Sequence, residues 1–245
     1  MNRPCWNSPF PLIPSLLLLL LSVISTGLAA EVPLRAFTAS YDLHKGYMHL
    51  AITDISLQRE GQQWRWSSTT KARGIYAVLV SSKPYSETTF IQVNDEIRLQ
   101  KILHTDPGDK KIHETASFDW DNGSIDVLRK GKRTQLPLDA EVYDYQSIHL
   151  LAISMRMQQL DKATVDFYRK GKISRSELVY GGKENVDING KTINADIYEQ
   201  VIVKSSSKIK YYYAAENPLF PIRVEKFKPG ESLVTLTLRK VDWNL

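Results

Sequence analysis

Turn-forming residues interrupt this chain at nearly regular intervals, about every eight to twelve residues over most of its length. The clearest turns are Asn122-Gly123 and Asn189-Gly190, because asparagine and glycine adopt positive φ at low cost. The segments between the turns are rich in β-branched and aromatic residues, and several of them alternate apolar with polar side chains. This pattern restricts the fold to one made mainly of antiparallel strands.

The same pattern gives the bounds of the expected strands. The segment 74–80 is too short for its periodicity to separate a short helix from a buried strand, so both alternatives stay open. The expected strands cover residues 36–43, 47–57, 63–71, 85–93, 97–104, 111–120, 124–129, 163–169, 172–180, 184–188, 192–203, 208–214, 222–227 and 232–243.

One segment in the middle of the chain has helical periodicity instead. Ile148, Leu151 and Met155 recur at three- and four-residue spacing, and Asp144 is a natural N-cap because its carboxylate accepts from the free N–H groups of the first turn. No proline-rich linker and no fixed repeat divides the chain. We therefore predict a mainly β, single-domain protein: an antiparallel, strongly curved sheet or open β-barrel with one central α-helix at about 144–160.

The N-terminus has the order of a secretory signal peptide. Arg3 supplies one positive charge, an apolar run covers residues 16–21, and small residues follow, with cleavage expected after Ala29. The apolar run is too short for a comfortable membrane span. We therefore expect residues 1–29 to be removed and residues 30–245 to form one β-rich domain in the periplasm of a Gram-negative bacterium.

Cysteine and charge narrow the function classes further. The only cysteine, Cys5, leaves with the signal peptide, so the mature chain has no disulfide, no thiol nucleophile and no thiolate metal site. The net charge of +5 falls to +4 without Arg3, and nucleic acid is a poor partner for an exported protein with so short a basic stripe. The basic run 129–133 is interpreted as a solvated turn, and the alternative is a contact with anionic lipid headgroups or phosphorylated sugars.

Motifs for catalysis or metal binding are missing from the sequence. No Gly-x-Ser-x-Gly elbow and no His-x-x-x-His pair occurs. His104 and His113 are interpreted as a cross-strand surface pair rather than as two metal ligands. The residue types of a Ser-His-Asp catalytic triad occur close together, as Asp144, Ser147 and His149. These three lie within about one helical turn, whereas the residues of a working triad converge from separate loops. We predict a non-catalytic protein without a metal or other cofactor.

Five segments in chain order resemble the exported bacterial family called domain of unknown function 3108. Tyr211-Tyr212-Tyr213 stands where the family often has a tryptophan, which is a departure from its pattern. The resemblance implies a periplasmic, β-rich protein without an assigned role, and it transfers no catalytic residues. The matching segments are 39–43, 72–76, the Asp-x-x-Ser of 144–147, the hairpin of 180–192 and the Leu-x-Pro-x-Arg pattern within 213–224.

Aromatic side chains are spread over most of the expected strands. The ordinary interpretation is that they form the core, because strands favour aromatic residues. The functional interpretation is a concave aromatic face with the helix as plug or lid, which holds an acyl chain or another apolar ligand. The ligand-binding candidates are then Trp64, Trp66, Met155, Tyr211 and Tyr213. Alternation also makes Tyr212 face away from its neighbours, so one face of that strand is a candidate for exposure.

These observations favour a periplasmic, non-catalytic protein that binds an apolar or amphipathic small ligand, or an envelope protein, in maintenance of the cell envelope. No transmembrane span is expected after cleavage, and the oligomeric state is open. A first alternative is a polysaccharide-binding or polysaccharide-processing protein that uses an exposed row of Trp64, Trp66 and Tyr212. A second alternative is a structural adaptor of an envelope complex with an apolar surface and no cavity.

Overall fold

A single sheet forms almost the whole molecule. The computed structural model describes residues 32–79, 82–94, 96–109, 113–216 and 218–243. Within these residues, fifteen strands follow the order β8-β7-β6-β5-β4-β3-β2-β1-β15-β14-β13-β12-β11-β10-β9, and β8 and β9 remain as unpaired edges. Every pairing is antiparallel except that of β9 with β10. The prediction of a curved antiparallel sheet that forms an open barrel is confirmed.

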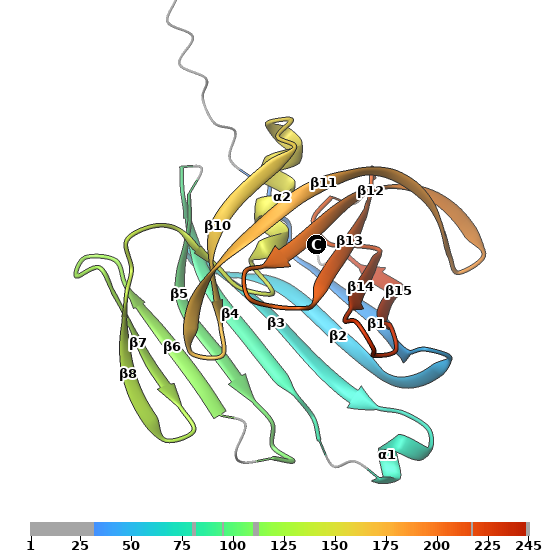
Figure 1. Cartoon of the computed structure of the whole chain (residues 1–245), viewed down its shortest axis with the longest axis horizontal. Helices are drawn as coiled ribbons and strands as arrows, with labels where there is room; N and C mark the ends of the chain where they lie inside the picture. The colour runs from blue at the N-terminus through green and yellow to red at the C-terminus, as the bar shows by residue number, and fades with distance from the viewer. Residues whose placement is uncertain (1–31, 80–81, 95, 110–112, 217, 244–245) are drawn as a thin grey trace, which may run out of the picture.

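The strands alternate in direction and are joined mostly by short turns (Figure 1). The first half contains β1 (Phe37–Lys45), β2 (Met48–Glu60), β3 (Gln63–Ala72), β4 (Tyr85–Val93), β5 (Glu96–Thr105), β6 (His113–Asp119), β7 (Ser124–Arg129) and β8 (Lys132–Pro137). The second half contains β9 (Val142–Tyr143), β10 (Lys162–Arg169), β11 (Lys172–Ile188), β12 (Lys191–Ile202), β13 (Lys208–Ala214), β14 (Arg223–Phe227) and β15 (Val234–Asp242).

Some elements of the structure differ from the expected ones, and one segment that the sequence left open is settled. The segment left open becomes a short helix, α1 (Ile75–Leu79). Two expected strands form one long strand, β11, because a bulge between Tyr180 and Gly182 lets the chain continue through Gly182 at a φ of +90°. Two strands, β8 and β9, were not expected: β8 is largely exposed and β9 has two residues, so neither has a clear alternation of buried and exposed side chains. Residues 111–112 of one expected strand lie outside the described residues.

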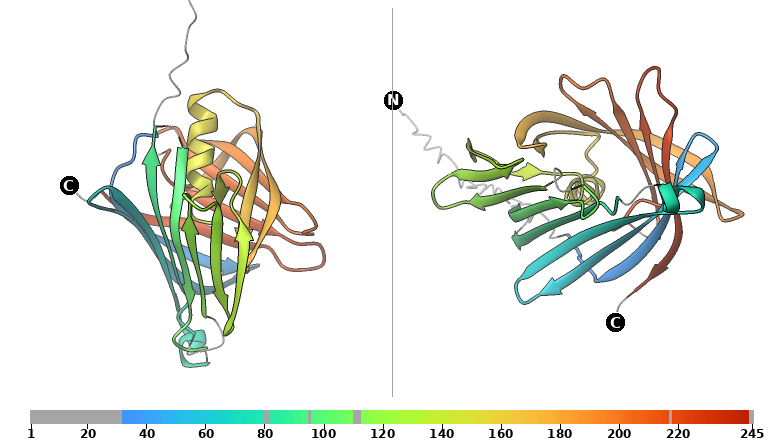
Figure 2. Two further views of the ribbon diagram at one scale, coloured as in Figure 1. Left: turned by 90° about the vertical axis from the view of Figure 1, so that its left-hand side faces the viewer. Right: turned by 90° about the horizontal axis from the view of Figure 1, so that it is seen from below.

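The helix α2 (Ile148–Met157) lies inside the curved sheet. Figure 2 shows it between the wall formed by the first strands and the wall formed by β10 to β15. Seven of its ten residues are buried, and they are not confined to one stripe. A helix that is apolar on nearly all sides belongs in a protein interior. Among the described residues, no helix has the length and apolar character needed to cross a membrane.

The prediction that Asp144 is the N-cap of the helix is wrong: Ser147 occupies the N-cap position of α2, and Asp144 lies buried three residues ahead of it. One carboxylate oxygen accepts from the backbone N–H groups of Gln146 and Ser147 at 3.1 and 2.8 Å. The other accepts from the Thr88 hydroxyl on β4 at 2.5 Å. Asp144 therefore fixes the turn that leads into the helix and joins it to the sheet.

Replacing Asp144 with alanine should lower the free energy of unfolding by about 2 kcal/mol, because the buried N–H groups of Gln146 and Ser147 lose their acceptor, whereas the Thr88 hydroxyl keeps Gln146 Oε1. Asp144→Asn should cost less, since the amide oxygen still accepts. Urea denaturation of both variants measures the difference. Equal losses for the two variants would contradict the proposed role of the acceptor oxygens.

Candidate functional site

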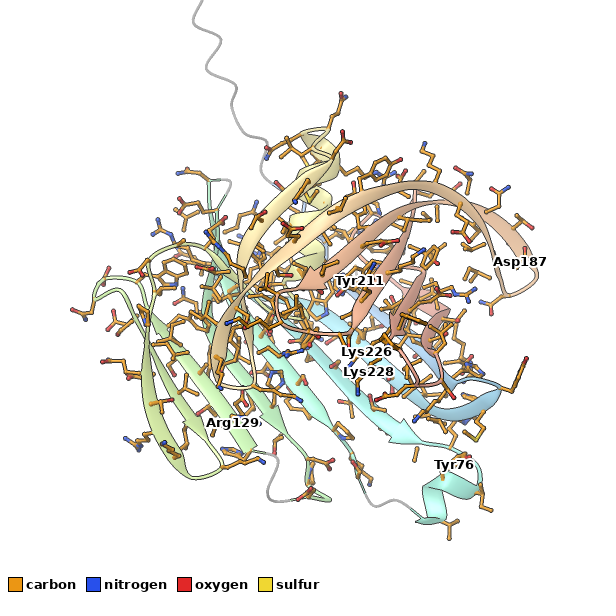
Figure 3. All side chains as sticks on the ribbon, in the orientation of Figure 1. Tyr76, Arg129, Asp187, Tyr211, Lys226 and Lys228 are labelled. Atoms are coloured by element: carbon orange, nitrogen blue, oxygen red, sulfur yellow. The ribbon has the colours of Figure 1, made fainter. Side chains whose placement is uncertain are left out.

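The residues predicted to line a binding cavity lie in the packed interior. Trp66, Met155, Tyr211 and Tyr213 are each at most 3 % exposed, and Trp64 is half-buried against the same core. Tyr211 lies near the centre of the molecule in Figure 3. The structure therefore brings these side chains together as expected, but it places them in the hydrophobic core.

His149 on α2 lies at the centre of this aromatic cluster. Its ring packs 5.4 Å from the Trp66 ring and 5.1 Å from the Tyr211 ring, measured between centroids. Its Nδ1 shares a hydrogen bond of 2.7 Å with the Tyr213 hydroxyl. Burial lowers the pKa of His149 from 6.5 to about 3, so the ring is neutral near pH 7. His149 is thus an interior hydrogen-bonding group.

The expectation that Tyr212 is exposed is wrong. Its side chain does point away from those of its neighbours, but all three tyrosines of β13 are buried. The Tyr212 hydroxyl donates to Glu225 at 3.0 Å, and the Arg223 guanidinium lies 5.9 Å from its ring centroid. These long polar side chains cover the ring by lying along it. An exposed row of Trp64, Trp66 and Tyr212, which the polysaccharide alternative requires, does not form.

A cavity of about 450 Å³ opens where the ends of β4, β5, β6, β7 and β10 meet. Its lining includes three tyrosines, four basic residues and two histidines. We call it the basic cavity. Its lining residues are Pro84, Tyr85, Ser86, His104, Thr105, His113, Glu114, Arg129, Lys130, Tyr145, Tyr168, Arg169 and Lys170.

Glu114 is the only carboxylate in that lining, and it is buried. Its Oε2 accepts from Arg129 Nε at 2.6 Å. Its Oε1 accepts from the Tyr168 hydroxyl at 2.9 Å and from the Gly171 N–H at 3.0 Å. Burial, followed by the Glu114 charge, raises the pKa of the Tyr168 hydroxyl far above its usual range, so this hydroxyl stays protonated and donates. The Glu114 carboxylate thus joins β6 and β7 to the β10–β11 turn.

Two tight turns carry the cations of the basic cavity. Lys130 and Gly131 connect β7 to β8, and Lys170 and Gly171 connect β10 to β11, all with φ between 52° and 76°. Two central residues with positive φ are the mark of the type I′ hairpin turn. Gly171 also needs its small size, because a Cβ there would lie 3.0 Å from the Arg129 side chain.

The charges of the basic cavity are unbalanced. Glu114 already pairs with Arg129. Within the described part of the chain, Lys130, Arg169 and Lys170 make no salt bridge. The cavity therefore presents three uncompensated cations beside tyrosine rings, which suits a ligand with both an anionic and an apolar part.

One other hollow of the surface has a different chemistry. A cavity of about 330 Å³ lies over β15, β1, β2 and β3, on the face opposite to the core, and its lining is mostly serine, threonine, aspartate and lysine side chains. No aromatic side chain lines it. The basic cavity is therefore the better candidate for a ligand with an apolar part.

The two histidines that the sequence suggested as a cross-strand pair are not directly opposite each other. The register of β5 and β6 pairs His104 with Glu114 and His113 with Thr105. His104 Nδ1 shares a hydrogen bond of 2.9 Å with the Ser86 hydroxyl. No group of three or more histidine, cysteine, aspartate or glutamate side chains suited to a metal ion occurs among the residues that the structure describes.

No pattern in the sequence marked Glu114, Tyr168 or Arg169 as site residues. The available signal was the basic run 129–133, whose alternative interpretation was a contact with anionic headgroups or phosphorylated sugars. Its first two residues, Arg129 and Lys130, line the basic cavity. The second basic turn, Arg169-Lys170, lies 40 positions further along the chain and meets the first only in the folded barrel.

Comparisons with known proteins identify a family and a fold. A family model described as "Protein of unknown function (DUF3108)" matches residues 37–239. A crystal structure of a β-barrel-like protein of domain of unknown function DUF1849 from Brucella abortus is 12 % identical, with a TM-score of 0.58 over 88 % of this chain and 99 % of that one. A Bacteroides fragilis protein with a YmcC-like fold is 8 % identical, with a TM-score of 0.32 over 87 % of this chain and 98 % of that one. No curated protein matches the chain.

Proposed function

The chain belongs to the DUF3108 family, a family of unknown function, and we propose that it is an exported, non-catalytic protein that binds an amphipathic ligand with an anionic headgroup in the basic cavity. One observation carries the proposal: Lys130, Arg169 and Lys170 stand without ion-pair partners, as far as the structure describes the chain, around a wall of tyrosines. The cations would bind the headgroup, and the aromatic wall would cover part of the apolar tail.

The place of action is also proposed. The signal peptide expected at residues 1–29 supports export, and a cell envelope is rich in amphipathic anions. The ligand is thus a candidate component of envelope maintenance. The packing around His149 supports the proposal indirectly. Trp66 and Met155 are part of the packed core, so the basic cavity is the better place for a ligand.

Dodecyl phosphate is a suitable probe, because it joins one alkyl chain to one anionic headgroup. We expect Arg169→Glu combined with Lys170→Glu to weaken its binding at least about tenfold, since two attractive charges become repulsive. Isothermal titration calorimetry measures the affinity. The matched control is Lys191→Glu, an exposed basic residue at the start of β12, which should bind as the wild type does.

Dodecyl maltoside, with the same tail and a neutral headgroup, completes the test and should bind more weakly than dodecyl phosphate. Equal affinities for the two probes, or an unchanged affinity in the double variant, would contradict the proposal. Binding of a protein from the envelope without binding of either probe would favour the adaptor alternative.

A further inference from the structure

An exposed apolar tip lies apart from the basic cavity. Tyr47 in the β1–β2 turn is 107 % exposed, and Ile75 and Val78 on α1 are 69 % and 86 % exposed. Within the described chain these side chains bury little surface, although water is a poor environment for them. Figure 1 shows α1 and the β1–β2 turn at the same lower corner of the molecule. We call Tyr47, Ile75 and Val78 the apolar tip.

The apolar tip rests on an ordered support. The Tyr76 hydroxyl of α1 contacts Met48 Sδ on β2 at 3.1 Å, and the Arg73 N–H donates to the Leu50 carbonyl at 2.9 Å. The Gly46 N–H donates to the Leu233 carbonyl at 2.8 Å, which fixes the β1–β2 turn against the start of β15. The two segments that carry the tip are thus held to the sheet and to each other.

Basic residues flank the apolar tip. Lys45 precedes Tyr47, and Arg73 precedes Ile75 by two residues; neither makes a salt bridge within the described part of the chain. Phe227, the last residue of β14, is 52 % exposed and lies between Lys226 and Lys228 in the chain. Lys226 makes no salt bridge among the described residues, whereas Lys228 pairs with Glu231. Figure 3 shows Lys226 and Lys228 next to each other near the middle of the view, Tyr76 below them at the lower corner, and Asp187 at the far β11–β12 hairpin.

We propose that the apolar tip and its flanking cations dock the protein on an anionic lipid surface. Single side chains that protrude from turns can enter the headgroup region, where lysine and arginine side chains at the same depth meet lipid phosphates. A protein partner of comparable affinity would need a larger and flatter apolar area than three separate side chains offer. The charge around the tip is complementary to a lipid surface that carries excess phosphate.

This docking is a second activity beside the proposed ligand binding, and one segment of the chain connects the two sites. The β3–β4 connection that carries α1 continues into Pro84 and Tyr85, which line the basic cavity. The segment that contacts the surface is thus contiguous in the chain with the wall of the cavity. The two activities use different residues, so a variant can remove one and leave the other.

Co-sedimentation of the mature protein with vesicles tests the docking. We expect binding to vesicles of phosphatidylglycerol and phosphatidylethanolamine, and much weaker binding to phosphatidylcholine vesicles. Ile75→Ser combined with Val78→Ser should reduce binding to the anionic vesicles at least about tenfold, because both side chains are exposed and leave the fold unchanged. Leu160→Ser is the matched control: Leu160 is 45 % exposed, follows α2 and should have no effect.

Three results would overturn the docking proposal: no binding of the wild type to anionic vesicles, equal binding to both kinds of vesicle, or full binding by the Ile75→Ser/Val78→Ser variant. If the Ile75→Ser/Val78→Ser variant binds fully while a Lys45→Glu/Arg73→Glu variant loses vesicle binding, the contact with the vesicles is purely electrostatic. Dodecyl phosphate affinity should remain that of the wild type in the Ile75→Ser/Val78→Ser variant. A failure of docking is therefore distinguishable from a failure of the ligand-binding proposal.

Discussion

Replacing Glu114 with alanine should lower the free energy of unfolding by about 3–5 kcal/mol and remove dodecyl phosphate binding. The buried Tyr168 hydroxyl and the Gly171 N–H would lose their common acceptor, and Arg129 would lose its counter-charge. The β10–β11 turn would then no longer be held against β6 and β7, where the basic cavity forms. Urea denaturation measures the stability, and calorimetry measures the binding.

Glu114→Gln is the matched control for that change. Its amide oxygen can still accept from Tyr168 or Gly171, so the loss of stability should be smaller than in the alanine variant. A loss below about 1 kcal/mol in Glu114→Ala would contradict the view that this carboxylate holds the β10–β11 turn against β6 and β7.

Acidification from pH 7 to pH 4 should cost about 3 kcal/mol of stability through His149 alone. The pKa of His149 is about 3 in the folded protein and 6.5 when the side chain is free of burial. Between these values the unfolded chain binds a proton that the folded chain does not, so stability is lost as the pH falls below about 6.5. Stability against urea, measured at several pH values, gives the slope.

His149→Phe separates this histidine from the carboxylates that also titrate in acid. The variant loses the hydrogen bond to Tyr213, so its stability at pH 7 should be lower than that of the wild type. Its stability should nevertheless change less than that of the wild type between pH 7 and pH 4. Parallel pH profiles for the two proteins would show that His149 titrates normally and is not buried as the structure describes.

Local patterns in the sequence were enough to predict most of the strands and turns. Asn189-Gly190 forms a two-residue hairpin turn with both residues at positive φ. Asn122-Gly123 ends the connection between β6 and β7, where Gly123 has positive φ and the Asp119 carboxylate accepts from Asn122. The continuous strand β11 was not predicted, because the glycines of its bulge are as typical of a turn. The edge strands β8 and β9 are too exposed or too short to carry a periodic pattern.

Local sequence patterns could not predict the candidate site, because the site is assembled from segments that lie far apart in the chain. Glu114 binds Tyr168 and Gly171, which lie 54 and 57 positions further along the chain. The aromatic residues chosen from the sequence are instead the core, since α2 enters the barrel and contacts them through His149. Aromatic content alone does not separate a packed interior from a binding surface, because strands use the same residues for both.

Native mass spectrometry of the mature protein tests the central claim most directly. The protein would be purified without detergent and mixed with an extract of envelope lipids, beside its Arg169→Glu/Lys170→Glu variant. We predict a complex of one chain with an anionic amphiphile for the wild type and its loss in the variant. A bare chain from the wild type, or the same bound molecule in both proteins, would contradict the claim that the basic cavity is the binding site.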